Sequence, residues 1–259
     1  FTGKGVGIAL IDSGVAPVSD IAVNLVKGPD LSFEARFRAF RTMDTFGHGT
    51  HMAGIIAGRS RYAVPGTYAN DTTTFLGMAP DAKLVSVKVA DVNGAVDVSQ
   101  VIAAIDWVVQ HRNDRGMNIK VINLSYGTNA SNDYTVDPLV FAAKQAWKKG
   151  IFVVAATGNA GFADKKTGSM MSPAYSPNLF AVAAADSNDT VAKKDDTVPP
   201  FSSSGNVQRR PDITAPGTHI VSLRVRGSWI DDRSGSTGRV SDTLFRGSGT
   251  SQAAAVVSG

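Results

Sequence analysis

Short, densely apolar segments recur along the chain at residues 6–11, 84–90, 120–124, 151–156 and 179–185. None of them alternates cleanly between apolar and polar side chains. This pattern is typical of strands that are buried on both faces of a sheet. The chain is therefore predicted to contain at least five strands of a buried, parallel sheet.

Helical spacing lies between these segments. Val101, Ile105 and Val108 recur at positions i, i+4 and i+7, and a polar stretch at 111–116 follows them. Residues 137–150 begin with Asp-Pro and end with Lys-Lys-Gly, which favours a second helix. Strands that alternate with helices predict a doubly wound, mostly parallel α/β sheet with helices on both faces. Chemistry in such folds gathers at the carboxyl ends of the strands.

Four stretches are rich in Ser, Thr, Asp, Asn and Gly, at 59–74, 161–176, 186–205 and 224–243. They are predicted to be surface loops. No internal repeat or linker divides the chain, so residues 1–259 are expected to form one domain.

The composition excludes several classes of protein. The formal net charge of the 259 residues is only +4, so nucleic acid is not an expected partner. Because the chain contains no Cys, disulfide frameworks, thiolate metal sites and a cysteine nucleophile are excluded. The apolar runs are shorter than the roughly 18 residues that a membrane span needs, and no span is expected.

Two candidate groups occur in the first fifth of the chain. Asp12 stands at the end of the first apolar segment, in an Asp-Ser-Gly sequence that is also ordinary turn chemistry. His48 lies between two glycines, just before a helix of small residues that other backbone can approach closely. A lone His is as often structural as functional.

Two further candidates occur later. Ser251 follows a glycine-rich turn and begins an alanine-rich helix, where its oxygen would lie near unpaired N–H groups or serve as a helix cap. Asn159 breaks a buried strand next to Gly158, as a turn residue or as an amide donor aimed at an oxyanion.

The order Asp, His, Asn, Ser along an α/β chain resembles the catalytic domain of subtilisin-like serine proteases, the subtilases or peptidase S8 family. The resemblance covers nearly the whole chain. The motifs that carry it are Asp12-Ser13-Gly14, Gly47-His48-Gly49-Thr50-His51-Met52-Ala53-Gly54, Gly77-Met78-Ala79-Pro80, Asn123-Leu124-Ser125-Tyr126-Gly127, Gly158-Asn159 and Gly249-Thr250-Ser251.

The resemblance implies a serine endopeptidase that acts through an acyl-enzyme and requires no cofactor for its chemistry. Ser251 would be the nucleophile and His48 the base that takes its proton. Asp12 would orient the imidazole. Asn159 and the backbone N–H of Ser251 would receive the oxyanion.

The resemblance also implies how a polypeptide substrate binds. The segment Ser125, Tyr126 and Gly127 would pair with an extended substrate as an added strand. Pocket walls would include Ala156, Thr157 and Gly158. An N-terminal propeptide inhibitor outside this chain, and a secreted or cell-surface bacterial location, are typical of the family.

The resemblance also implies a metal site. Many subtilases hold a structural calcium ion before the Gly-x-Ala-Pro motif, and Asp71 and Asp20 offer oxygen ligands for one here. His51 follows His48 at a His-x-x-His spacing, but the His-Glu-x-x-His pattern of zinc proteases is absent. In the family a second His commonly follows at this place without being the base, so the resemblance implies that His51 supports His48.

The chain departs from the family pattern in two ways. Gln252 stands where a Met is usual after the nucleophile. Only 11 residues precede Asp12 and 8 follow Ser251, so the peptidase domain is expected to be truncated at both ends.

Two alternative functions stay open at this point. A non-catalytic subtilase-like module would bind peptides without turnover, and a peptide ligase or cyclase would transfer the same acyl-enzyme to an amine.

Overall fold

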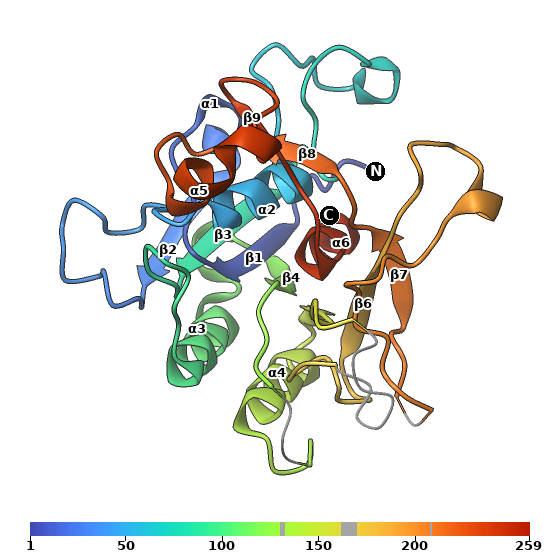
Figure 1. Ribbon diagram of the computed structural model, residues 1–259. Helices are drawn as coiled ribbons and strands as arrows, with labels where there is room; N and C mark the ends of the chain where they lie inside the picture. Colours follow the sequence, from blue (N-terminus) through green and yellow to red (C-terminus); the bar gives the residue numbers. More distant parts are fainter. Residues whose placement is uncertain (130–132, 162–169, 208) are drawn as a thin grey trace.

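A seven-stranded sheet forms the centre of the protein (Figure 1). The computed structural model describes residues 1–129, 133–161, 170–207 and 209–259. Every strand pairing in this sheet is parallel, which confirms the predicted fold class. The strands, in sheet order, are β2 (Leu25–Asp30), β3 (Lys83–Lys88), β1 (Gly7–Asp12), β4 (Ile119–Leu124), β5 (Phe152–Ala156), β6 (Phe180–Ala185) and β7 (Ile213–Pro216).

The five predicted strands are β1, β3, β4, β5 and β6, each within two residues of the expected ends. Within this sheet the hydrophobic pattern missed two strands, β2 and β7, which lie at its edges. An edge strand is buried less completely and carries a weaker apolar signal. Gly28 and Pro29 interrupt β2, and Pro216 ends β7.

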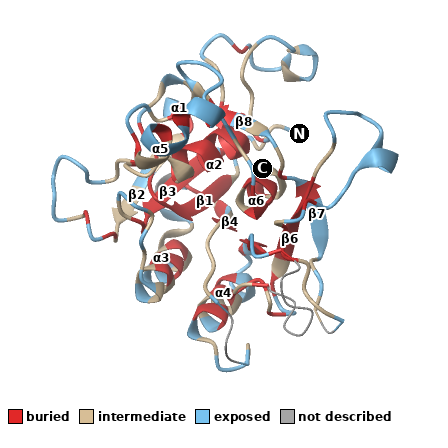
Figure 2. Cartoon of the chain, in the orientation of Figure 1, coloured by how far each residue is buried: buried red, intermediate tan, exposed pale blue. Residues whose placement is uncertain are grey.

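Helices cover both faces of the sheet, as predicted. The side chains of β1 alternate between them, with Ile11 packing among α3 (Val98–His111) and α4 (Pro138–Lys148). On the other face Leu10 packs with Met52 of α2 (His48–Ala57). The helix α6 (Thr250–Ser258) continues this second layer over β5 and β6. Figure 2 shows the buried residues concentrated in the sheet and on the inner faces of these helices.

The helix ends follow the sequence signals. Asp97 and Gln100 form a reciprocal capping box at the start of α3. Asp137 caps α4 and is followed by Pro138, while Gly150 beyond its end has a φ of 77°. The remaining short helix, α1 (Ser19–Ala22), lies beside α2. None of the helices in the described ranges is long and apolar enough to cross a membrane.

The prediction of a surface loop at 224–243 is wrong. This stretch contains the helix α5 (Trp229–Gly238), which contacts β9 (Leu244–Gly247) of an antiparallel hairpin with β8 (Ile220–Leu223). The buried carboxylate of Asp231 in α5 forms ion pairs with Arg224 at 2.6 Å and Arg239 at 3.0 Å. Ion pairs therefore help to hold this helix in place. Because it does not depend on a row of apolar side chains, its sequence lacks the periodic pattern that would have predicted a helix.

The other predicted loops contain 3-10 turns, Tyr68–Asn70 within 59–74 and Lys193–Asp195 within 186–205. A third 3-10 turn, Asp114–Gly116, lies in the polar stretch after α3. The predicted loop at 161–176 falls partly outside the described residues.

Candidate active site

Asp12 and His48 meet at the carboxyl edge of the sheet. Asp12 is the last residue of β1, and His48 is the first residue of α2. The Nδ1 atom of His48 lies 2.8 Å from one carboxylate oxygen of Asp12 and 3.0 Å from the other. A Cβ atom on Gly49 would collide with the carbonyl oxygen of Gly14, so the glycine next to His48 allows this close approach.

Opposing effects set the pKa of His48. Burial of the ring lowers it, whereas the charge and hydrogen bond of Asp12, together with the charge of Asp44, raise it above the ordinary value of 6.5. In the neutral ring, Nδ1 carries the proton that is donated to Asp12. The other nitrogen, Nε2, is then the basic atom.

The buried carboxylate of Asp44 organises the turn before His48. It accepts hydrogen bonds from the Ser13 hydroxyl at 2.9 Å and from the backbone N–H groups of Gly47 and Thr50 at 2.7 Å each. Burial raises the pKa of Asp44 in spite of these bonds. Asp44 was not predicted from the sequence, although an acidic residue four positions before His48, near the start of a helix, is a signal for such a role.

Ser251 and Asn159 meet at the start of α6. The Oδ1 atom of Asn159 accepts hydrogen bonds from the backbone N–H of Thr250 at 2.9 Å and from its hydroxyl at 3.1 Å. This pairing assigns the oxygen of the amide and leaves Nδ2 as the group that can donate. The Ser251 hydroxyl donates a long hydrogen bond of 3.4 Å to the carbonyl oxygen of Ser125.

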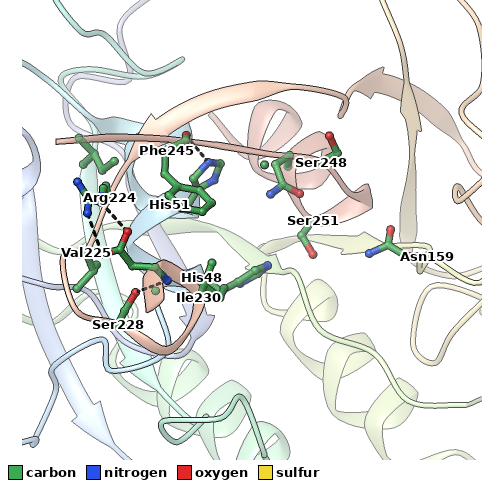
Figure 3. A pocket seen from close by; sticks show the side chains of 15 residues that line it. His48, His51, Asn159, Arg224, Val225, Ser228, Ile230, Phe245, Ser248 and Ser251 are labelled. Carbon is green, nitrogen blue, oxygen red and sulfur yellow. Dashed lines mark hydrogen bonds and ion pairs between the residues drawn. The ribbon is translucent and has the colours of Figure 1, made fainter. Parts of the chain in front are cut away.

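One pocket of about 230 Å³ brings three of the four predicted groups together. His48, Ser251 and Asn159 all line it, and Figure 3 shows Ser251 between the other two. Asp12 lies behind His48 and lines a neighbouring pocket with it. Groups from β1, α2, α6 and the end of β5 thus converge on one place.

Two residues beside these groups have structural contacts. His51 lies in the wall of the same pocket, with Nε2 3.1 Å from the carbonyl oxygen of Phe245. Burial and the charge of His48 lower the pKa of His51 to about 4, so its ring is neutral at pH 7. Gln252 is only 7% exposed, and its amide packs against the α-carbons of Gly247 and Gly249.

The predicted substrate segment follows β4. The Ser125 hydroxyl accepts a hydrogen bond from Asn123 at 2.9 Å and donates one to the carbonyl oxygen of Ser251 at 3.1 Å. Tyr126 lines the pocket beside Asp12 and His48. The second predicted wall is less open, because the side chains of Ala156 and Thr157 are buried.

Met171, which no sequence motif marked, lies between Gly127 and Gly158. A Cβ atom on Gly127 would lie 2.7 Å from the Met171 Cβ, and one on Gly158 would lie 2.6 Å from its Cγ. The backbone N–H of Met171 donates to the carbonyl oxygen of Thr157 at 2.9 Å. The side chain of Met171 is thereby held against Gly127 and Gly158.

The two predicted calcium ligands, Asp71 and Asp20, lie in the loop before the Gly-x-Ala-Pro motif and in α1. The Asp71 carboxylate accepts hydrogen bonds from Thr73 and Thr74 of its own loop, and these lower the pKa of Asp71 to about 2. No group of three or more His, Asp or Glu side chains arranged to hold a metal occurs in ranges 1–129, 133–161, 170–207 and 209–259.

Comparison with known proteins places the chain among proteases of one family. The family model described as the subtilase family matches residues 3–259. The chain is 35% identical over 265 residues to the serine protease AprX of Bacillus subtilis (strain 168), covering all of this chain and 56% of AprX. It is 33% identical to subtilisin Savinase of Lederbergia lenta, covering 86% of this chain and 67% of Savinase.

A solved structure agrees with this result. The crystal structure of a cold adapted subtilisin-like serine proteinase superposes with a TM-score of 0.72 and 28% identity, over all of this chain and 74% of that one. Since the chain spans 56% of AprX and 28% of the minor extracellular protease Epr of Bacillus subtilis (strain 168), the matches concern part of those proteins. The fold, the family model over almost every residue and these relatives together show that this chain belongs to the subtilase family.

Proposed function

We propose that the chain is the catalytic domain of a serine endopeptidase. The observation that carries the proposal is the hydrogen-bonded Asp12–His48 pair beside a pocket that His48 shares with Ser251 and Asn159. A nucleophile, a base oriented by a third group and an amide donor are the parts that acyl transfer needs.

The chemistry follows from these positions. Ser251 Oγ attacks the carbonyl carbon of a peptide bond and gives its proton to His48 Nε2. Asn159 Nδ2 and the backbone N–H of Ser251 donate to the resulting oxyanion. The C–N bond then breaks as His48 passes the proton to the leaving amine. A water molecule attacks the acyl-enzyme in the same way and regenerates the Ser251 hydroxyl.

We also propose that polypeptides bind in extended form along residues 125–127. The open carbonyl and N–H groups of a segment beyond a strand end can pair with a substrate main chain, which gives affinity with little sequence demand. An extracellular location belongs to the proposal, supported by the printed name of Epr as a minor extracellular protease. A removable propeptide stays a prediction of the family resemblance.

Cleavage of an unfolded protein substrate tests the proposal. The wild-type protein should cut it, and Ser251→Ala should not. Asn159→Ala should lower kcat about 10²–10³-fold, a magnitude established on an asparagine donor of a subtilisin. Mass analysis of the products with and without an added amine separates hydrolysis from ligation. Substrate binding without any cleavage by the folded wild-type protein would establish the non-catalytic alternative, and new amide products would establish the ligase.

We do not extend the proposal to calcium, because the Asp71 carboxylate is already engaged by its own loop. Thermal unfolding in excess chelator checks this point. An unchanged midpoint is expected, and a midpoint that falls with chelator and returns with added calcium would contradict it.

A further inference from the structure

Six consecutive exposed residues, Arg-Phe-Arg-Ala-Phe-Arg at 36–41, form a distinctive surface between β2 and α2. We call this segment the Arg-Phe tip. Figure 1 shows the blue segment between β2 and α2 projecting from the body of the molecule, and Figure 2 shows exposed residues along it. Phe37 and Phe40 are each 48% exposed. The two phenyl rings lie together and alternate with arginines, a grouping that single exposed apolar residues elsewhere on the surface lack.

The ends of the segment are fixed, so the tip is presented by a folded base. On one side Asp30 accepts a hydrogen bond from the backbone N–H of Thr42 at 2.9 Å. On the other, Glu34 forms an ion pair of 3.0 Å with the fully buried Lys88. Asp30 and Glu34 are thus engaged at the base of the segment. Neither carboxylate neutralises the arginines of the tip.

The tip alternates cationic and aromatic groups. Among the described residues, Arg36, Arg38 and Arg41 form no ion pair. The Arg36 guanidinium lies 4.8 Å from the centre of the Phe37 ring, and Phe37 contacts Phe40 edge to face at 6.5 Å. The outer surface therefore offers three positive charges and two apolar rings with no negative charge among them.

We propose that the Arg-Phe tip docks on a lipid bilayer that carries anionic headgroups. Arginines attract such headgroups, and aromatic side chains enter the boundary between headgroups and acyl chains. An acidic peptide would match the positive charge alone, whereas the boundary of an anionic bilayer also accepts the two phenyl rings. Because the tip projects, it can reach a flat bilayer surface. Binding there would not require catalysis.

Vesicle sedimentation of the full chain tests the proposal. The wild-type protein should bind vesicles of equal parts phosphatidylcholine and phosphatidylglycerol, bind phosphatidylcholine vesicles weakly, and bind less as salt rises. The triple variant Arg36→Gln, Arg38→Gln, Arg41→Gln should lose affinity on the order of 100-fold, at about fivefold for each arginine. The double variant Phe37→Ser, Phe40→Ser should bind the anionic vesicles more weakly than the wild-type protein. Its remaining binding should also fall more steeply with salt than that of the wild-type protein, because only charge then holds it.

A matched control separates the tip from net charge. Lys4→Gln, Lys193→Gln, Lys194→Gln removes three exposed charges elsewhere and lowers the formal net charge to the same +1. This variant should retain wild-type binding, and every variant should keep the wild-type unfolding midpoint. Three results would overturn the proposal: no binding of wild type to the anionic vesicles, equal loss in the control, or tip-dependent binding to an immobilised polyglutamate peptide without binding to vesicles.

Discussion

The ring of His48 carries two opposing electrostatic effects whose balance can be measured. Its enclosure favours the neutral form, and the carboxylates of Asp12 and Asp44 favour the charged form strongly enough to raise the pKa. A base must be neutral to accept a proton. The activity of the proposed enzyme should therefore be lost, as pH falls, at a pH above 6.5, because the charged form persists to higher pH.

The pH profile of kcat/KM checks the sign of this effect. The acidic limb should lie above pH 6.5 for the wild-type protein. In Asp12→Asn the burial effect is left without its main opponent, so the limb should move to lower pH while kcat falls on the order of 10⁴-fold. A limb that stays in place in Asp12→Asn would show that Asp12 does not set the pKa of His48.

Met171 provides a second prediction at this scale, one that rests on the proposed substrate groove. Its side chain lies against Gly127 and Gly158, two residues of the proposed groove. If substrate binds there, we expect Met171 to limit the size of the side chain that fits. The wild-type protein is therefore expected to prefer small residues before the cut bond. Met171→Gly should raise kcat/KM for Phe relative to Ala at that position about tenfold or more.

The control for this substitution is Met78→Gly, because Met78 is 54% exposed and is not among the nearest neighbours of Gly127 or Gly158. Its Phe-to-Ala ratio should equal that of wild type. If an active Met171→Gly protein kept the wild-type ratio of kcat/KM for Phe to that for Ala, Met171 would not limit the substrate groove. The proposed catalytic chemistry would be unaffected by that result.

The helix α5 is held by ion pairs to a buried carboxylate. Asp231 is 3% exposed and bridges Arg224 and Arg239. These partners hold the pKa of Asp231 below its usual range, mainly through the hydrogen bonds from Arg224. Asp231→Asn should lower the free energy of unfolding by about 3–5 kcal/mol, because it leaves a buried guanidinium without its counter-charge.

Denaturant unfolding at pH 7 and at acidic pH checks this prediction. A carboxylate with a depressed pKa stabilises the fold above its unfolded pKa and loses that contribution as pH falls through the folded pKa. The difference between wild type and Asp231→Asn should therefore narrow at strongly acidic pH. Asp232→Asn, at the exposed neighbour in the same turn, should change stability by less than about 0.5 kcal/mol.

The elements also show what the sequence could reveal. Strands buried on both faces and capped amphipathic helices carry their own signal, and five strands with α3 and α4 were predicted on that basis. The edge strands β2 and β7 and the hairpin of β8 and β9 lack a dense apolar run. The helix α5 is specified by ion pairs that exist only once Arg224 and Arg239 are folded around Asp231.

The same limit applies to the candidate site as a whole. Asp12, His48, Asn159 and Ser251 were found because each follows a recognisable strand end or helix start, and their order matched a family. Asp44 carried only a weak local signal, an acidic residue just before a helix, and its contact with Ser13 joins distant segments. Met171 acts through its contacts with Gly127 and Gly158, which no local pattern marks. Packing of the sheet between its two helical layers brings Asp12, His48, Asn159 and Ser251 to the carboxyl edge of the sheet.

Reaction with a fluorophosphonate probe tests the central claim most directly. The folded protein should take up one probe per chain, and peptide mass analysis should place it on Ser251. Ser251→Ala should take up none, and His48→Ala should react far more slowly, because the hydroxyl then lacks its base. Absence of labelling in correctly folded wild-type protein, or labelling at a residue other than Ser251, would contradict the account.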